Sequence, residues 1–278
     1  MKYRFGLVVP PCIFAAMLSF TGTVTAVAQN QTPGVSPPPK VLEVITEYLK
    51  PGQQVSPHMK SEAVFAQAMR DAKWPTHYIG TDAITGQTRA VFFVGYDSFA
   101  DWQKDTDAQM ANKDLASKLD KATVDDGALL SEVQTSAYVY RQDLSLRPNL
   151  DISQMHYFDI TIFHVKSGHG RDFENVAKMF VSGYDKVSDV HWTTFQKMYG
   201  KDSGSIFIVV TPMKSLAEVD QGMGNDQKLL AAVGQDQLGK MMDAANAAID
   251  SSESNLYSAN PKMSYVPDTW DQSFWGQR

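Results

Sequence analysis

The sequence predicts an α+β protein in which two tandem halves, residues 41–148 and 157–267, together form one barrel. The first observation is an internal repeat. Residues 44–52 resemble residues 160–168, and the similarity continues in the same order, at nearly the same offset, through both halves. The second observation is that both halves show the same succession of strand, helix, two strands, helix and strand. Chance similarity would not keep this order over so long a stretch.

Each half is predicted to open with a strand that ends at a glycine turn, Lys-Pro-Gly at 50–52 and Lys-Ser-Gly at 166–168. Side chains alternate between the two faces of such a strand. The more apolar face, which we expect to meet the helices, carries Leu42, Val44, Phe158, Ile160 and Ile162. The opposite face, which we expect to line the barrel, carries Glu43, Ile45, Glu47, Asp159, Thr161 and Phe163.

A helix is predicted to follow each opening strand. In the first half it covers residues 59–72, and in the second half a single apolar stripe runs along residues 173–184. Two further strands then come in each half. The turn signals between them, at 85–87 and at 200–204, predict a hairpin.

The second helix of each half is predicted to begin at Ser98 and at Ser215. Glu218 stands three residues after Ser215, which makes a capping box, and the first half has a weaker version. The last strands are expected to begin near Ser136 and Asn255. The resulting β-α-β-β-α-β order is that of a ferredoxin-like unit, whose sheet has one bare face. We therefore expect the two bare faces to bury each other, as an internal pseudo-dimer within a monomer.

The first 28 residues have the pattern of a secretory signal peptide. Lys2 and Arg4 precede an apolar stretch over residues 5–20, and small residues lead to a cleavage site after Ala28. Cleavage there would remove Cys12, the only cysteine of the chain. The pattern predicts a secreted or periplasmic protein that contains no disulfide.

Three short segments lie outside the two halves: a Pro-rich linker at 29–40, a connector at 149–156 and an aromatic C-terminal tail at 268–278. The chain has 278 residues and a formal net charge of -6. Such a chain lacks the basic surface that phosphate binding needs, so nucleic acid is not an expected partner. No segment after the signal is long and apolar enough to span a bilayer, and we expect the exported protein to be soluble.

Two segments resemble the dimeric α+β barrel superfamily. Residues 42–52, Leu-Glu-Val-Ile-Thr-Glu-Tyr-Leu-Lys-Pro-Gly, are similar to the first strand of NIPSNAP-like and antibiotic-biosynthesis-monooxygenase-like proteins. Residues 96–102 resemble the entry into their second helix, and the resemblance takes the form of a tandem duplication in one chain. Ile45 and Thr161 stand where the family often has an arginine. The resemblance implies the fold, and it implies a cofactor-free monooxygenase-like or haem-handling activity as an alternative to ligand binding alone.

Seven residues are candidates for binding a ligand: Glu43, Glu47, His77, Tyr138, Asp159, His191 and Tyr257. Three are carboxylates expected inside the barrel, where burial would raise their pKa values and suit them to acid–base work. Two are histidines that begin the second strand of each half and are suited to proton transfer or haem ligation. Two are tyrosines matched on the last strands. Structural ion pairs, local hydrogen bonds and core packing are the alternative roles of these side chains.

Neither matched histidine has neighbours at a spacing typical of metal ligands, so no metal site is predicted, and haem is the one cofactor kept open. His58, His156 and His169 fall at element ends and are expected to be solvated. We interpret the chain as an exported protein that binds a small, partly apolar ligand in a barrel cavity, with enzymatic activity undecided. The alternatives are an enzyme of the kind that the resemblance implies and an interaction module of the cell envelope.

Overall fold

A computed structural model of the chain describes residues 34–187, 189–202 and 204–277. The predicted signal peptide and the first residues of the predicted linker lie outside these ranges. Within them, no helix has the length and apolar character needed to cross a membrane.

The described strands form a closed antiparallel barrel of eight, in the order β1-β3-β2-β8-β5-β7-β6-β4. The first four make the row β4-β1-β3-β2, and the last four make the row β8-β5-β7-β6. The rows join where β2 pairs with β8 and β4 pairs with β6. In chain order the strands are β1 (Val41–Leu49), β2 (Tyr78–Ala83), β3 (Arg89–Tyr96), β4 (Leu130–Tyr140), β5 (Tyr157–Val165), β6 (Thr193–Tyr199), β7 (Ser205–Met213) and β8 (Ile249–Ala259).

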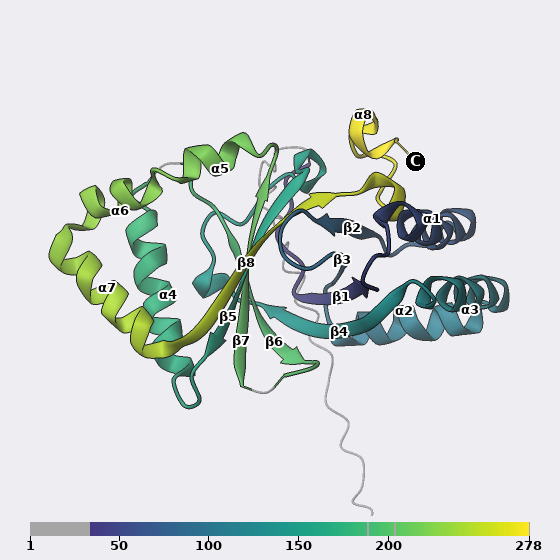
Figure 1. Cartoon of the computed structure of the whole chain (residues 1–278). Coiled ribbons are helices and arrows are strands. Elements are labelled where there is room, and N and C mark those ends of the chain that lie inside the picture. Colours follow the sequence, from purple (N-terminus) through teal and green to yellow (C-terminus); the bar gives the residue numbers. More distant parts are fainter. Residues whose placement is uncertain (1–33, 188, 203, 278) are drawn as a thin grey trace, which may run out of the picture. The chain divides into compact units, whose positions relative to one another are not determined.

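The helices lie outside the barrel in two groups (Figure 1). Beside β1–β4 are α1 (Val55–Ala72), α2 (Phe99–Ala111) and α3 (Lys113–Gly127). Beside β5–β8 are α4 (Gly170–Tyr184), α5 (Ala217–Gly222), α6 (Asn225–Val233) and α7 (Gln235–Ala248). A short helix, α8 (Gln272–Trp275), ends the described chain.

Two local predictions were wrong. The last strands begin at Leu130 and Ile249, six residues earlier than expected, because their first residues are exposed and polar and give no apolar alternation. The capping box lies in the other half: the Ser98 side chain accepts from the backbone N–H of Asp101 at 3.1 Å and caps α2. In the second half, the Glu218 carboxylate instead accepts from the backbone N–H of Lys214 at 2.7 Å, and α5 has no side-chain cap.

The barrel interior is filled by apolar side chains from both rows, and this reverses the predicted orientation of the opening strands. Leu42, Val44, Phe158 and Ile160 point inward and share one buried cluster. An eight-stranded barrel is just wide enough for side chains to fill it. Because the interior is closed on all sides it is the driest place in the fold, and it takes the more apolar strand face. The face with the carboxylates is turned toward the helices.

The end segment that follows each row packs on the other row. Ser145, which comes after β4, accepts with its Oγ from the backbone N–H of Thr194 on β6 at 2.9 Å. Ser264, which comes after β8, accepts in the same way from the backbone N–H of Gly80 on β2 at 2.9 Å. Beside it, Tyr265 is buried against the α1 and α3 helices of the first row. Each row is therefore completed by a segment of the other.

Both described chain ends also pack against the barrel. Residues 37–39 of the predicted linker line a cavity of about 150 Å³ at the barrel mouth, together with Leu42 and Phe158. The C-terminal tail folds back as well: Trp275 is 1% exposed, belongs to the interior cluster and donates from Nε1 to the Ser153 carbonyl at 2.7 Å. The ends of the barrel are thus closed by segments that contribute no strand.

Candidate functional site

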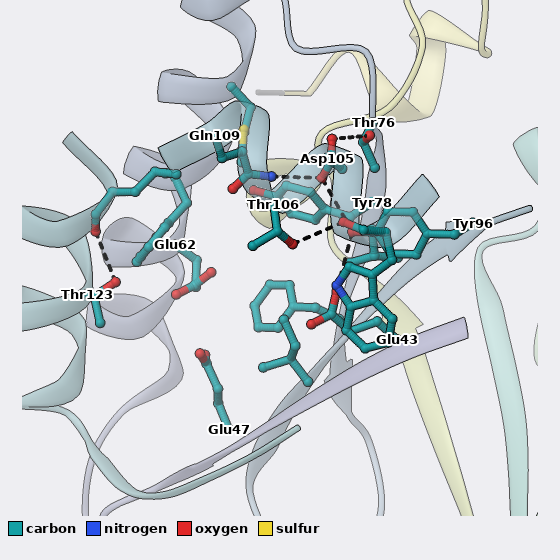
Figure 2. Close-up of a pocket in the computed structure, with 17 residues that line it drawn as sticks. Glu43, Glu47, Glu62, Thr76, Tyr78, Tyr96, Asp105, Thr106, Gln109 and Thr123 are labelled. Atoms are coloured by element: carbon teal, nitrogen blue, oxygen red, sulfur yellow. Dashed lines mark hydrogen bonds between the residues drawn. The ribbon is translucent and has the colours of Figure 1, made fainter. Parts of the chain in front are cut away.

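The candidate site is a cavity between the outer face of β1, β2 and β3 and the helices α1, α2 and α3 (Figure 2). Its volume is about 330 Å³, within the range found for small-molecule sites. Carboxylates gather at two places in its wall. The apolar part of the wall consists of Ile45, Phe65, Met69, Phe92, Val94 and Leu119.

At one end of this pocket, Tyr96 stands between two carboxylates. Its hydroxyl lies 3.5 Å from Glu43 Oε2 and 3.4 Å from Asp105 Oδ2. Burial raises the pKa of Glu43 to about 7, and the charge of Asp105 raises it further against the lowering effect of the Tyr96 hydroxyl. Burial also raises the pKa of Tyr96 well above its ordinary value, so this hydroxyl keeps its proton at neutral pH. Glu43 can therefore exchange a proton near neutrality.

Asp105 is held by other donors and does not depend on Tyr96. Its Oδ1 accepts from Trp74 Nε1 at 2.8 Å and from Thr76 Oγ1 at 2.6 Å. Its Oδ2 accepts from Gln109 Nε2 at 2.9 Å. Three donors hold this carboxylate in place. Its fixed negative charge makes ionisation of the neighbouring Glu43 less favourable.

At the other place, a histidine and three carboxylates from three elements come together: Glu47 of β1, His58 and Glu62 of α1, and Asp126 of α3. His58 Nε2 lies 3.0 Å from Glu47 Oε2 and 3.6 Å from Asp126 Oδ1. Burial alone would lower the pKa of His58, but the hydrogen bond to Glu47 and the charges of Asp126 and Glu47 outweigh it and raise that pKa. Burial, with the same two charges, raises the pKa of Glu62.

The structure brings together two of the seven predicted site residues, Glu43 and Glu47, and places them outside the barrel. The prediction that they line the barrel interior was wrong, because the more apolar face of each opening strand fills that interior. Asp159 also faces away from the interior. It lines a different cavity of about 630 Å³, beside α5 and α6, which it shares with His191. His191 Nε2 is bonded there to the Pro212 carbonyl at 2.8 Å.

The remaining three predicted residues lie apart from both cavities. Tyr138 and Tyr257 are buried in the barrel interior, and the Tyr257 hydroxyl accepts from Arg89 Nη2 at 2.6 Å. His77 stacks on Tyr265, with 4.6 Å between ring centroids, and burial lowers its pKa. Whether any of the seven binds a ligand stays a prediction.

The sequence analysis missed His58, Glu62 and Asp126. His58 was expected to be solvated, yet it is fully buried. The signal was present in the helix periodicity: His58 and Glu62 extend the buried stripe of α1 that continues at Ala66. Asp126 likewise follows Ala122 on the buried stripe of α3. Charged residues at helical spacing on an apolar face were the pattern to look for.

The two histidines that suggested haem as a cofactor, His77 and His191, do not support a haem site. In the described ranges, His77 lines neither cavity, and His191 has its Nε2 engaged by a backbone carbonyl. His58 has its Nε2 engaged by Glu47. None of these three histidines combines a place in a cavity wall with a free Nε2 for an axial position, so we derive no step through haem.

Comparison with known proteins gives a fold and no closer kinship. No family model matches the sequence, and no curated protein matches it. Among solved structures, an anthrone oxidase-like protein is 11% identical with a TM-score of 0.52, and the match covers 84% of this chain and 96% of that one. A putative monooxygenase from Fusobacterium nucleatum subsp. nucleatum is 10% identical with a TM-score of 0.51, over 80% of this chain and 93% of that one.

A putative chlorite dismutase is 9% identical with a TM-score of 0.46, over 80% of this chain and 96% of that one. At such low sequence identities, the similarity to these solved structures shows a shared fold alone. The chain is an α+β protein with a closed eight-stranded antiparallel barrel, and it shares its fold with the anthrone oxidase-like protein and the putative monooxygenase.

Proposed function

We propose that the pocket beneath α1, α2 and α3 is the active site of an oxygenase-type enzyme that takes a proton from a small, partly apolar substrate. The observation that carries this proposal is Glu43, a carboxylate in a largely apolar cavity with a pKa raised to about 7. A base is most effective when its pKa lies near the working pH. Two neighbours with TM-scores above 0.5 are named as an anthrone oxidase-like protein and a putative monooxygenase, which is consistent with this class of reaction.

In the proposed reaction, Glu43 accepts a proton from an acidic CH₂ group of the substrate. The electron pair left on carbon passes to O₂, which is the oxidant. Overall, one CH₂ group and one O₂ give one carbonyl group and one water, so that one oxygen atom enters the substrate and the other leaves with both hydrogens. The Tyr96 hydroxyl, protonated at neutral pH, donates to the Glu43 carboxylate and orients it. Trp102, whose ring stacks on Tyr96, supplies an aromatic wall for the substrate.

Glu43→Gln is expected to lower the rate of O₂ uptake with anthrone as the probe by at least about 100-fold, the usual contribution of a general base. For the unmodified protein, kcat/KM should rise with pH and level off above about pH 7, because Glu43 acts only after losing its proton. Tyr96 and Asp105 face Glu43, and the raised pKa of Tyr96 keeps its hydroxyl protonated through this range. An oxygen electrode measures the rate, and quenching of Trp102 fluorescence measures binding.

Glu132→Gln is the matched control, because Glu132 is an exposed carboxylate paired with Lys201 outside the pocket. It should leave O₂ uptake unchanged. A Glu43→Gln protein that oxidises anthrone at the unmodified rate would contradict the assignment of the base. Absence of O₂ uptake by the unmodified protein would contradict the reaction class.

The chain also fits a tandem duplication that acts as one monomer. The support is the matching strand order of the two rows and the reciprocal contacts of Ser145 and Ser264, which stand at corresponding places after β4 and β8. Corresponding contacts at corresponding positions are expected of two copies of one unit, each of which completes the other.

Export belongs to the same proposal, because the N-terminal pattern of basic, apolar and small residues is that of a cleaved signal. N-terminal sequencing of protein exported from a bacterial host is expected to begin at Gln29. A mature chain that still begins at Met1 would contradict cleavage and the secreted or periplasmic location.

A further inference from the structure

We propose that Glu47, His58, Glu62 and Asp126 form a binding site for a divalent first-row transition-metal ion at the α1–α3 end of the pocket. The ligand set comes from β1, α1 and α3, so the fold and not the local sequence brings it together. The inference goes beyond the proposed reaction, because ion binding requires neither a substrate nor Glu43.

The geometry of the cluster is close to that of a coordination shell. One potential ligand atom from each of the four residues lies within 4.8 Å of all the others. Four-coordinate zinc sites are tetrahedral, with bonds to nitrogen and oxygen of about 2.0–2.2 Å, so their ligand atoms are roughly 3.4 Å apart. Side-chain movements of up to roughly 1 Å would bring all four atoms to bonding distance.

A second observation, independent of the clustering, is that buried oxygens in it have no hydrogen-bond partner. Glu62 is 4% exposed and Asp126 is 2% exposed, and neither Glu62 Oε1 nor Asp126 Oδ1 accepts a hydrogen bond from any part of the chain that the structure describes. Figure 2 shows the carboxylates of Glu62 and Glu47 directed toward one another across the pocket. Buried polar atoms are almost always satisfied by protein, water or an ion. These oxygens can only accept when ionised, so a cation satisfies them best.

The charge of the cluster points the same way. Among the described residues, the carboxylates of Glu47 and Asp126 form ion pairs with His58, and Glu62 forms none. If all three were ionised, the carboxylates around this one imidazole would carry more negative charge than a single histidine can offset. A divalent cation at their centre would offset two of these charges and remove the repulsion among them.

The donor atoms limit which ion fits. One imidazole nitrogen with three carboxylate oxygens is a hard to borderline set, suited to Mn²⁺, Fe²⁺ or Zn²⁺. It lacks the thiolate or thioether sulfur that selects Cu⁺. The pocket side of the cluster, where Glu47 and Glu62 form part of the cavity wall, leaves room for water or a ligand atom to complete the coordination.

The test is direct titration of the purified chain, after treatment with a chelator, with MnCl₂ and with ZnCl₂. Calorimetry is expected to give one ion per chain, and visible absorption should report Co²⁺ in the same site. Glu62→Gln and Asp126→Asn keep the size of each side chain and should each lower the affinity by at least about tenfold, because loss of a ligand costs no less than loss of its supporting hydrogen bonds. Asp172→Asn is the matched control: it removes the carboxylate of an exposed pair with His169, 2.9 Å apart, and should leave the affinity unchanged.

Each outcome bears on the ion alone. Absence of binding by the unmodified chain overturns the proposal, and so does equal affinity of Glu62→Gln and the unmodified chain. The four residues would then form an ion-pair network around a protonated His58. If the variants do not fold, anomalous diffraction from crystals of the unmodified chain grown with MnCl₂ decides, and the proposal requires the ion among these four residues. The test measures ion binding and not turnover. If the proposed reaction at Glu43 fails, the result for ion binding therefore still stands.

Discussion

Trp275→Ala is expected to lower the free energy of unfolding by about 3–5 kcal/mol, the usual cost of truncating a buried large aromatic side chain. Trp275 is 1% exposed and packs in the interior cluster although it lies only three residues from the end of the chain. The substitution removes its contacts with Trp270 and Phe274, whose ring centroids lie 5.1 and 5.0 Å away. It also opens a void at the end of the barrel.

Urea denaturation followed by circular dichroism measures this loss, as a lower midpoint at a similar slope. Trp275→Phe is the matched variant. It keeps an aromatic ring in the interior and removes the Nε1–H that donates to the Ser153 carbonyl, so it should cost less than Trp275→Ala. A loss below about 1 kcal/mol for Trp275→Ala, in the range of an ordinary surface substitution, would mean that the tail does not close the barrel in solution.

Residues 41–148 expressed alone are expected to form a homodimer or to aggregate. In the whole chain, β2 pairs with β8 and β4 pairs with β6, so the isolated half has two strand edges without partners. It would also expose the inward face that carries Leu42, Val44 and Val91. An exposed apolar surface of this kind drives association.

Light scattering coupled to size-exclusion chromatography distinguishes the outcomes, and the full chain, expected to run as a monomer, is the control. Pairing of two copies of the half would rebuild a barrel with twofold symmetry, as the tandem duplication predicts. A soluble and stable monomer of residues 41–148 would contradict both the duplication and the need for the second row.

The strand and helix order could be predicted from the sequence because it depends on local periodicity and on the repeat between residues 44–52 and 160–168. Which face of each opening strand points into the barrel could not be predicted. Both faces of β1 are buried, one in the barrel and one under helices, and alternation alone does not say which face meets which neighbour. The choice depends on closure of the barrel, which makes its interior drier than the pocket that holds Glu43.

The candidate site could be predicted only in part, for a related reason. Glu43 and Glu47 share a strand face, so their alternation suggested a common site. His58 and Glu62 share a helix face with Ala66 and could have been found by extending that stripe. Asp126 could not have been joined to them, because the contact between α1 and α3 arises from tertiary packing over more than sixty residues of chain. Matched positions in the two halves were a poor guide to shared function, since His77 and His191 lie in different surroundings.

The reciprocal end segments have a consequence for how the chain reaches its folded state. Tyr265 packs against the helices beside the pocket, and Ser264 bonds to β2, yet both are made almost two hundred residues after β2. Contacts so distant along the chain form slowly, because a long loop must close before they stabilise anything. During synthesis, the contacts around this pocket can therefore be completed only after nearly the whole chain has been made.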